Sequence, residues 1–127
     1  DCQKDLLTFE DLIKGNYVIC SSAMIHRSLL PIVYGFPEDS DLRALEDYAL
    51  WLRIATQTAF AFVNQPLVTY LDSPNTSIRA QGENGWVQRR HVFTNFLQWA
   101  HPQVVNKNCI DYALQMYDEA LKKIFVN

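Results

Sequence analysis

The chain has 127 residues, a length that accommodates one compact domain and is short for two. Apolar residues make up 49% of it and charged residues 20%, which is typical of a globular protein that can bury a core. The net charge of −3, without any block of like charge, argues against nucleic-acid binding, because that binding needs a basic face.

The first elements predicted are a short helix over residues 8–14 and a strand over residues 16–25. Thr8 is a suitable N-cap, Asp11 follows at the capping-box spacing, and Gly15 ends the helix. The next stretch is rich in β-branched and aromatic residues, so we expect a strand that is covered on both faces.

A short helix is expected over 28–33, with Ser28 as its cap, and the Gly, Pro and acidic residues of 35–41 predict a loop. From Glu46 the period of the hydrophobic pattern changes, and apolar residues then recur at the spacing of a helix. This pattern predicts a longer helix that runs to about residue 56.

Two more short strands are predicted, over 60–63 and 67–70, with a turn between them at 64–66 and another turn at 72–75. Two long helices complete the chain. The first carries a broad apolar stripe and stops at His101-Pro102, and Asn108 is expected to cap the second. This order predicts an α/β or α+β layer with a two-helix C-terminal appendage.

Several site classes find no support. No apolar run approaches the roughly 20 residues that a membrane-crossing helix needs. The three cysteines, Cys2, Cys20 and Cys109, show neither disulfide-framework nor zinc-site spacing, so we expect reduced thiols. Phosphate-binding glycine motifs and nucleophile motifs are absent from the sequence. The basic doublets, Arg89-Arg90 and Lys122-Lys123, are interpreted as solvated helix faces.

Glu46-Asp47 is the sharpest candidate for a catalytic site. Both acids fall at the start of a predicted helix, where unpaired N–H groups and the helix dipole favour negative charge. A carboxylate held there stays ionised at neutral pH, as a general base must. Spacing alone favours the simpler interpretation, in which the two acids cap a helix.

Weaker candidates lie upstream. Ser21-Ser22 could offer hydroxyls to a sugar, although serines in a strand more often mark tight packing. Arg27 could contact an anion, although an exposed arginine after a strand usually needs no ligand. The aromatic residues of the long helix are expected in a core or an interface, and the two histidines of the tail lack a second metal ligand at a suitable spacing; these residues are Trp86, Phe93, Phe96, Trp99, His91 and His101.

The string "GNYVICSSAMIHRSLLPIVYGFPEDSDLRALEDYALWLRIA", residues 15–55, resembles a block of the family 2 glycosyltransferases, which have the GT-A fold. The family pattern has Asn, a hydrophobic strand, Ser-Ser, a basic residue, a short helix, Gly-Gly-Phe, an acidic loop and Glu-Asp-Tyr-Asp-Leu-Trp-Leu-Arg. The resemblance covers residues 8–79 and includes the segment "FAFVNQPLVTYLDSPNTSIR".

The resemblance implies an inverting transfer of a sugar from a nucleotide-sugar to an acceptor hydroxyl, with Asp47 as the catalytic base. Glu46 would orient the acceptor or the donor sugar. Ser21, Ser22 and Met24 would line the acceptor cleft, and Arg27 matches the basic residue of the pattern.

The sequence also departs from the family pattern. Tyr34 replaces the first Gly, Ala49 an acid, Leu71 an Arg, and Ser73 a His that assists the metal and diphosphate in relatives. The nucleotide-binding strands and the Asp-x-Asp motif of the family's N-terminal half have no counterpart here. Asp39-Ser40-Asp41 has the right letters but lies in the wrong place, the loop before the Glu-Asp helix.

We therefore expect the C-terminal, acceptor-side half of a GT-A-like fold, with an α/β part over 1–79 and a helical tail over 80–127. The chain does not begin with Met, so it is expected to belong to a longer parent. The parent would use Mn²⁺ or Mg²⁺ bound by its N-terminal half, act on a glycan or lipid-linked acceptor, and be cytoplasmic or peripheral at the inner face of the membrane. This chain alone would bind no metal, be inactive and self-associate through an open sheet edge. The alternative is a non-catalytic module that docks a partner through its helical tail.

Overall fold

The computed structural model describes residues 5–69, 71 and 84–126. It combines α-helices with one small antiparallel sheet, in which Leu6 pairs with Ala61 and Leu7 with Phe60. This is a mixed α and β architecture, as expected. The elements in chain order are β1 (Leu6–Leu7), α1 (Phe9–Ile13), the 3₁₀ turn η1 (Cys20–Ser22), α2 (Leu29–Val33), the 3₁₀ turn η2 (Ser40–Leu42), α3 (Glu46–Ala55), β2 (Phe60–Ala61), α4 (Gly85–Ala100) and α5 (Lys107–Phe125).

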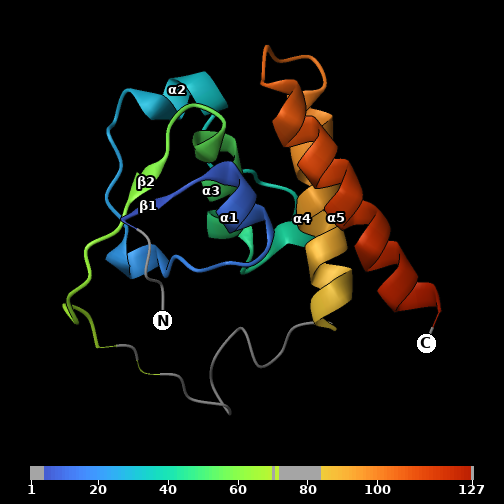
Figure 1. Ribbon diagram of the computed structural model, residues 1–127, viewed down its shortest axis with the longest axis horizontal. Coiled ribbons are helices and arrows are strands. Elements are labelled where there is room, and N and C mark those ends of the chain that lie inside the picture. The colour runs from blue at the N-terminus through green and yellow to red at the C-terminus, as the bar shows by residue number, and fades with distance from the viewer. Residues whose placement is uncertain (1–4, 70, 72–83, 127) are drawn as a thin grey trace.

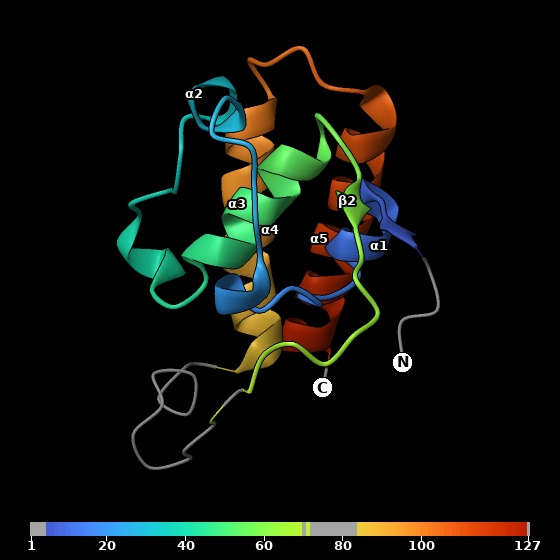
Figure 2. The same ribbon diagram turned by 90° about the vertical axis from the view of Figure 1, so that its left-hand side faces the viewer.

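Helices α4 and α5 form an antiparallel hairpin along one side of the molecule (Figure 1). The connection between Ala100 and Lys107 is short, so the second helix folds directly back on the first. Helix α3 packs against the hairpin on one face and against α2 on the other, while α1 contacts both α3 and the hairpin (Figure 2). The start of α4 therefore lies beside the end of α5, at the opposite end from the connection.

Helix α1 forms because its N-terminus is capped in both directions. The Asp11 N–H donates to Thr8 Oγ at 3.4 Å, and the Thr8 N–H donates to Asp11 Oδ2 at 2.9 Å. This is the predicted capping box, and the helix gives way to turn geometry at Lys14, directly before Gly15. The helix is short, so its stability comes from the burial of Phe9, Leu12 and Ile13 rather than from propensity.

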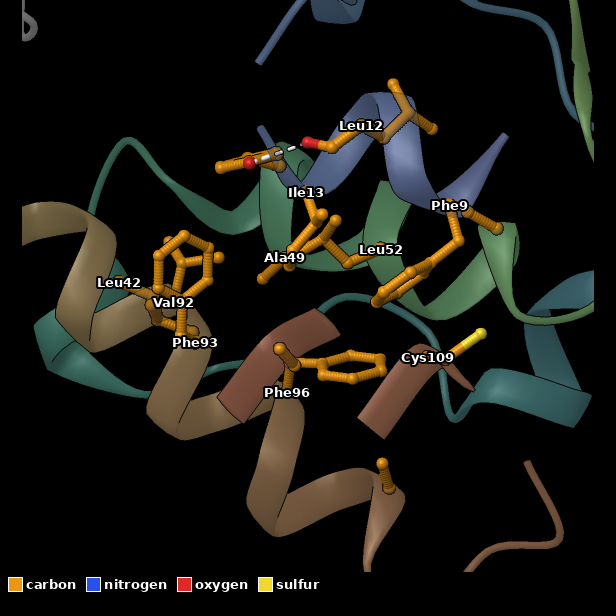
Figure 3. Close-up of a cluster of buried hydrophobic side chains, with 14 of the residues drawn as sticks. Phe9, Leu12, Ile13, Leu42, Ala49, Leu52, Val92, Phe93, Phe96 and Cys109 are labelled. Atoms are coloured by element: carbon orange, nitrogen blue, oxygen red, sulfur yellow. Dashed lines mark hydrogen bonds between the residues drawn. The ribbon is translucent and has the colours of Figure 1, made fainter. Parts of the chain in front are cut away.

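The core is built around α3, whose residues from Tyr48 to Ala55 are all buried. One face of α3 joins α1, α4 and α5 in the cluster drawn in Figure 3, where the Phe9 and Phe96 rings lie 5.0 Å apart between centroids. The other face packs on α2 through Leu50, Trp51 and Ile54. Because α3 is covered on two opposite sides, it carries more apolar residues than a helix with one face in solvent.

Two predicted strands are wrong. Residues 16–25 form irregular backbone with η1 inside it, and residues 67–69 are exposed and have no assigned secondary structure. Tyr17, for example, keeps 61% of its surface exposed, so the apolar run is not covered on both faces. A strand needs a pairing partner, and β2 takes β1 instead. Position 70 and the turn predicted at 72–75 lie outside the described residues.

The predicted helices are confirmed, with changes at their caps. Asn106, not Asn108, caps α5, because its Oδ1 accepts the Asn108 N–H at 2.9 Å. Ser28 precedes α2 but makes no capping bond, and its Oγ lies 2.6 Å from His26 Nδ1. Helix α4 ends at Ala100, directly before His101-Pro102, as predicted.

Candidate functional site

Glu46 and Asp47 are the first two residues of α3, and both side chains are half-buried. Asp47 Oδ1 accepts the Tyr48 N–H at 2.7 Å, so the carboxylate satisfies one of the N–H groups that the first helical turn leaves without an intrahelical partner. Leu45, the residue at the N-cap position, makes no side-chain cap bond. Asp47 thus helps to cap α3, as expected if the two acids only start a helix. Its carboxylate is also partly exposed to solvent.

The backbone that leads into these acids is strained. Ala44, two residues before Glu46, has a φ of 67°, a left-handed conformation that non-glycine residues rarely adopt. Tyr34, at the end of α2, has a φ of 63°, and Gly35 follows with 68°. Strained positions of this kind persist where the surrounding structure holds them in place, and they cluster at functional sites. Both ends of the segment 34–45 therefore have unusual backbone.

A buried polar network holds this segment. Arg53 of α3 is only 6% exposed, and its Nη2 donates to Asn95 Oδ1 of α4 at 2.9 Å. Asn95 Nδ2 in turn donates to Asp39 Oδ2 at 2.6 Å. The Arg53 Nη1 donates to the Val33 carbonyl at 3.2 Å, and the guanidinium lies 5.4 Å from the centre of the Trp99 ring. One arginine therefore ties the loop before α3 to α2 and to α4.

Burial lowers the pKa of the Arg53 guanidinium, and the negative charge of Asp39 opposes this shift. The network includes residues that we did not predict from the sequence, Arg53 and Asn95. A signal was present, because an arginine inside the apolar helix 46–56 and an asparagine inside the apolar stripe of α4 each need a buried partner. The pairing itself has no local signature, since the two residues are 42 positions apart.

Tyr48, directly after Asp47, anchors the start of α3 on α1. Its buried hydroxyl donates to the Leu12 carbonyl at 2.7 Å, the bond that ends at Leu12 in Figure 3. Burial raises the pKa of the Tyr48 hydroxyl well above its ordinary value, the charge of Arg89 opposes the shift, and Tyr17 adds to it. The neutral hydroxyl is therefore the form that the fold requires.

The structure brings η1 close to the acids. Partial burial raises the pKa of the Cys20 thiol, and the Asp47 carboxylate raises it further, so Cys20 lies within electrostatic reach of Asp47. Ser21 and Ser22 belong to the same turn and are exposed, and Ser22 Oγ donates to the Ile19 carbonyl at 2.7 Å. Ser21 and Ser22 thus lie on an exposed turn whose Cys20 is within electrostatic reach of the candidate base, rather than on the strand that we predicted.

Met24 and Arg27, the other two site candidates, are both exposed. The Met24 side chain is 97% exposed, and Arg27 is exposed in the turn that precedes α2. Helix α2 itself packs beside the later part of α3, at Leu50 and beyond, and not beside its first turn. Residues 16–25 do not form the strand that would have placed Met24 in line with the two serines. Met24 therefore does not line a cleft in this structure.

Within the described part of the chain, no group of three or more His, Cys, Asp and Glu side chains is arranged to hold a metal ion. Cys20 and Cys109 are free thiols, and burial raises the pKa of Cys109. The aromatic residues of α4 are mostly internal, because Phe93 and Phe96 are fully buried and Trp99 packs against both clusters.

Leu71, one of the departures from the family pattern, is 90% exposed, and Ser73 lies outside the described residues.

Over the described residues, no helix is both long and apolar enough to cross a membrane. Comparison with family models, curated proteins and solved structures gave no match to the chain.

Proposed function

We propose that this chain is the acceptor-side part of an inverting glycosyltransferase and that Asp47 is its general base. The carboxylate accepts the proton of an acceptor hydroxyl while that oxygen bonds to the anomeric carbon of a nucleotide-sugar. The bond from this carbon to the nucleotide breaks on the opposite face, and the electron pair leaves with the phosphate. The observation that carries the proposal is the half-buried carboxylate pair in the first turn of α3, at the end of a strained and anchored loop.

The backbone supplies independent support at the Gly-Gly-Phe element of the resemblance. Positions 34 and 35, which correspond to the two glycines, both have left-handed φ angles. Glycine is favoured in that conformation because it has no Cβ, so the family's glycines and this backbone agree. Ala49, where the family often has an acid, is almost fully buried, and an ionised side chain there would be costly.

The proposal divides the active site between two halves. Glu46 orients a sugar beside Asp47, and the exposed hydroxyls of Ser21 and Ser22 bond to the acceptor. Arg27 contacts an anionic group of the acceptor, and Met24, which lines no cleft in the chain alone, is left without a role. The nucleotide and the Mn²⁺ or Mg²⁺ ion are bound by a half that precedes Asp1, and Mn²⁺ or Mg²⁺ there would stabilise the leaving diphosphate.

The first test titrates the chain alone with a nucleotide-sugar and Mn²⁺ by calorimetry. We expect no metal-dependent binding, and tight binding would refute the division between halves. The second test uses the protein in which this chain is joined to its nucleotide-binding half. Asp47→Asn should lower kcat at least about 100-fold while nucleotide-sugar binding is retained. Asp41→Asn, the same change in the exposed turn η2, is the matched control, and equal turnover in the two variants would contradict the assignment of Asp47 as base.

The alternative, an interaction module that docks through the helical tail, draws less support. Its proposed contacts were Trp86, Phe93, Phe96 and Trp99, and two of these are fully buried in the core of the chain itself. Phe93 and Phe96 have no surface to offer a partner, which leaves Trp86 and Trp99, both only partly buried, as contacts of the tail.

A further inference from the structure

The fold gathers two basic doublets that are far apart in the sequence. Arg89 and Arg90 lie near the start of α4, and Lys122 and Lys123 lie in the last turn of α5. Because the two helices are antiparallel, the beginning of α4 and the end of α5 lie at the same end of the hairpin (Figures 1 and 2). We call this region, with Trp86 and Phe125, the basic end.

Trp86 is at the centre of the basic end. The Arg89 guanidinium carbon lies 4.8 Å from the centre of its ring, and Lys123 Nζ lies 6.0 Å from it. Both distances are within the range of a cation–π interaction, so one half-buried ring joins a cation of α4 to a cation of α5. Arg89 and Lys123, one from each doublet, are therefore neighbours in space, while the side chain of Lys122 stays largely exposed.

Apolar surface accompanies these charges. Phe125, the last residue of α5, is 72% exposed, and Val126 beside it is similarly exposed. The acids of the last turns of α5 offset part of the charge, since Lys122 Nζ lies 3.1 Å from Asp118 Oδ2, and Glu119 follows. Within the described residues, four basic side chains against these two acids leave the basic end cationic on a chain whose net charge is −3.

We propose that the basic end of the α4–α5 hairpin is a docking surface for an anionic lipid bilayer. Cationic side chains are attracted to anionic headgroups, and a Trp and a Phe beside them fit the boundary between headgroups and acyl chains. The net charge of the chain is −3, so the residues outside the basic end are negative in sum, and this asymmetry favours an approach with the basic end towards the bilayer.

The proposal needs no sugar transfer, so it stands or fails apart from the proposed function. The probe is a set of vesicles, either phosphatidylcholine alone or phosphatidylcholine mixed with anionic phosphatidylglycerol, separated from free protein by flotation. We expect binding to the anionic vesicles only, and we expect it to weaken as salt screens the charges.

The variant that tests the surface is Lys122→Gln/Lys123→Gln. Each lysine near an anionic surface contributes a factor of about five, and Lys122 is already paired with Asp118, so the partition coefficient should fall about tenfold. The matched control is Lys14→Gln/Lys107→Gln, which removes two charges outside the basic end, one of them from a lysine with a similar pair to Glu10. The control should stay within about twofold of the unchanged chain.

A third variant, Phe125→Ser, separates apolar insertion from electrostatics. It should weaken binding most in high salt, where the charges are screened. Equal binding to neutral and anionic vesicles, or equal losses in the two lysine double variants, would overturn the proposal. So would an acidic peptide that binds at Lys122 and Lys123 while the vesicles do not. Circular dichroism of each variant checks that the helices are intact.

Discussion

Substitution of Asn95 by Leu should destabilise the fold strongly, because this one side chain makes two hydrogen bonds to charged groups. Asn95 is 8% exposed and bridges two charged groups, since its amide oxygen accepts from Arg53 and its amide nitrogen donates to Asp39. Leucine has a similar volume but offers neither a donor nor an acceptor. The buried Arg53 would keep only the Val33 carbonyl and the Trp99 ring.

The magnitude follows from the kind of bond that is lost. A hydrogen bond to a charged group contributes about 1.5–3 kcal/mol net, and the Asp39 bond counts for less because its carboxylate reaches solvent. Leucine recovers part of the loss through apolar burial. We therefore expect the free energy of unfolding to fall by about 3 kcal/mol, which is a large share of the roughly 5–15 kcal/mol of a typical domain.

Urea unfolding followed by far-ultraviolet circular dichroism measures the change. The midpoint should fall while the slope stays constant, since the surface exposed on unfolding is nearly the same. Asn108→Leu is the matched control, because its exposed side chain lies outside the core at the start of α5, and it should change stability by less than about 0.5 kcal/mol. A loss below about 1 kcal/mol for Asn95→Leu would refute the reasoning.

Three further predictions test the site. Tyr48→Phe should cost about 1 kcal/mol, and it should flatten the loss of stability above about pH 10. The sign follows from the raised pKa of Tyr48, because the folded state keeps a proton that the unfolded state releases, so folding weakens as pH rises. An identical alkaline decline in both proteins would exclude Tyr48 as its source. Asp47→Asn should shift the pH profile of Cys20 alkylation to lower pH, because the carboxylate raises the pKa of that thiol. The measurement uses a chain in which Cys2 and Cys109 are replaced by Ser. An unchanged profile would show that the charge of Asp47 does not act on Cys20 of η1. Tyr34→Gly should stabilise the fold by up to about 1 kcal/mol in thermal unfolding, because glycine removes the left-handed strain; a destabilised variant would show that Tyr34 is held by other contacts.

The helices were predictable because their signals are local. Thr8 and Asp11 are three positions apart and cap α1 through bonds that the spacing alone predicts. The start of α3 at Glu46 follows from a change of period, and the stop of α4 from Pro102. In each case the residues that decide the element lie within a few positions of one another.

The irregular segments were not predictable for the opposite reason. Residues 16–25 have the composition of a strand, but a strand also requires a partner that no local pattern specifies. The strand at Phe60 was predicted from its composition, but its pairing with Leu7 was not, because no local pattern marks the partner segment. The same holds at the candidate site, where the acids were predicted from helix spacing but the bridge from Asp39 to Asn95 joins residues 56 positions apart.

The two proposals constrain the acceptor when they are taken together. Arg89 of the basic end lies close enough to Tyr48 for its charge to affect that hydroxyl, and Tyr48 directly follows Asp47. Arg89 is thus within electrostatic reach of the residue that follows Asp47 in the first turn of α3. An acceptor that is itself anchored in the bilayer would meet Asp47 from the side of the headgroups, whereas a soluble glycan would gain nothing from the docking. Of the two acceptor classes, we therefore propose the lipid-linked one, because it would use both the carboxylate and the basic end.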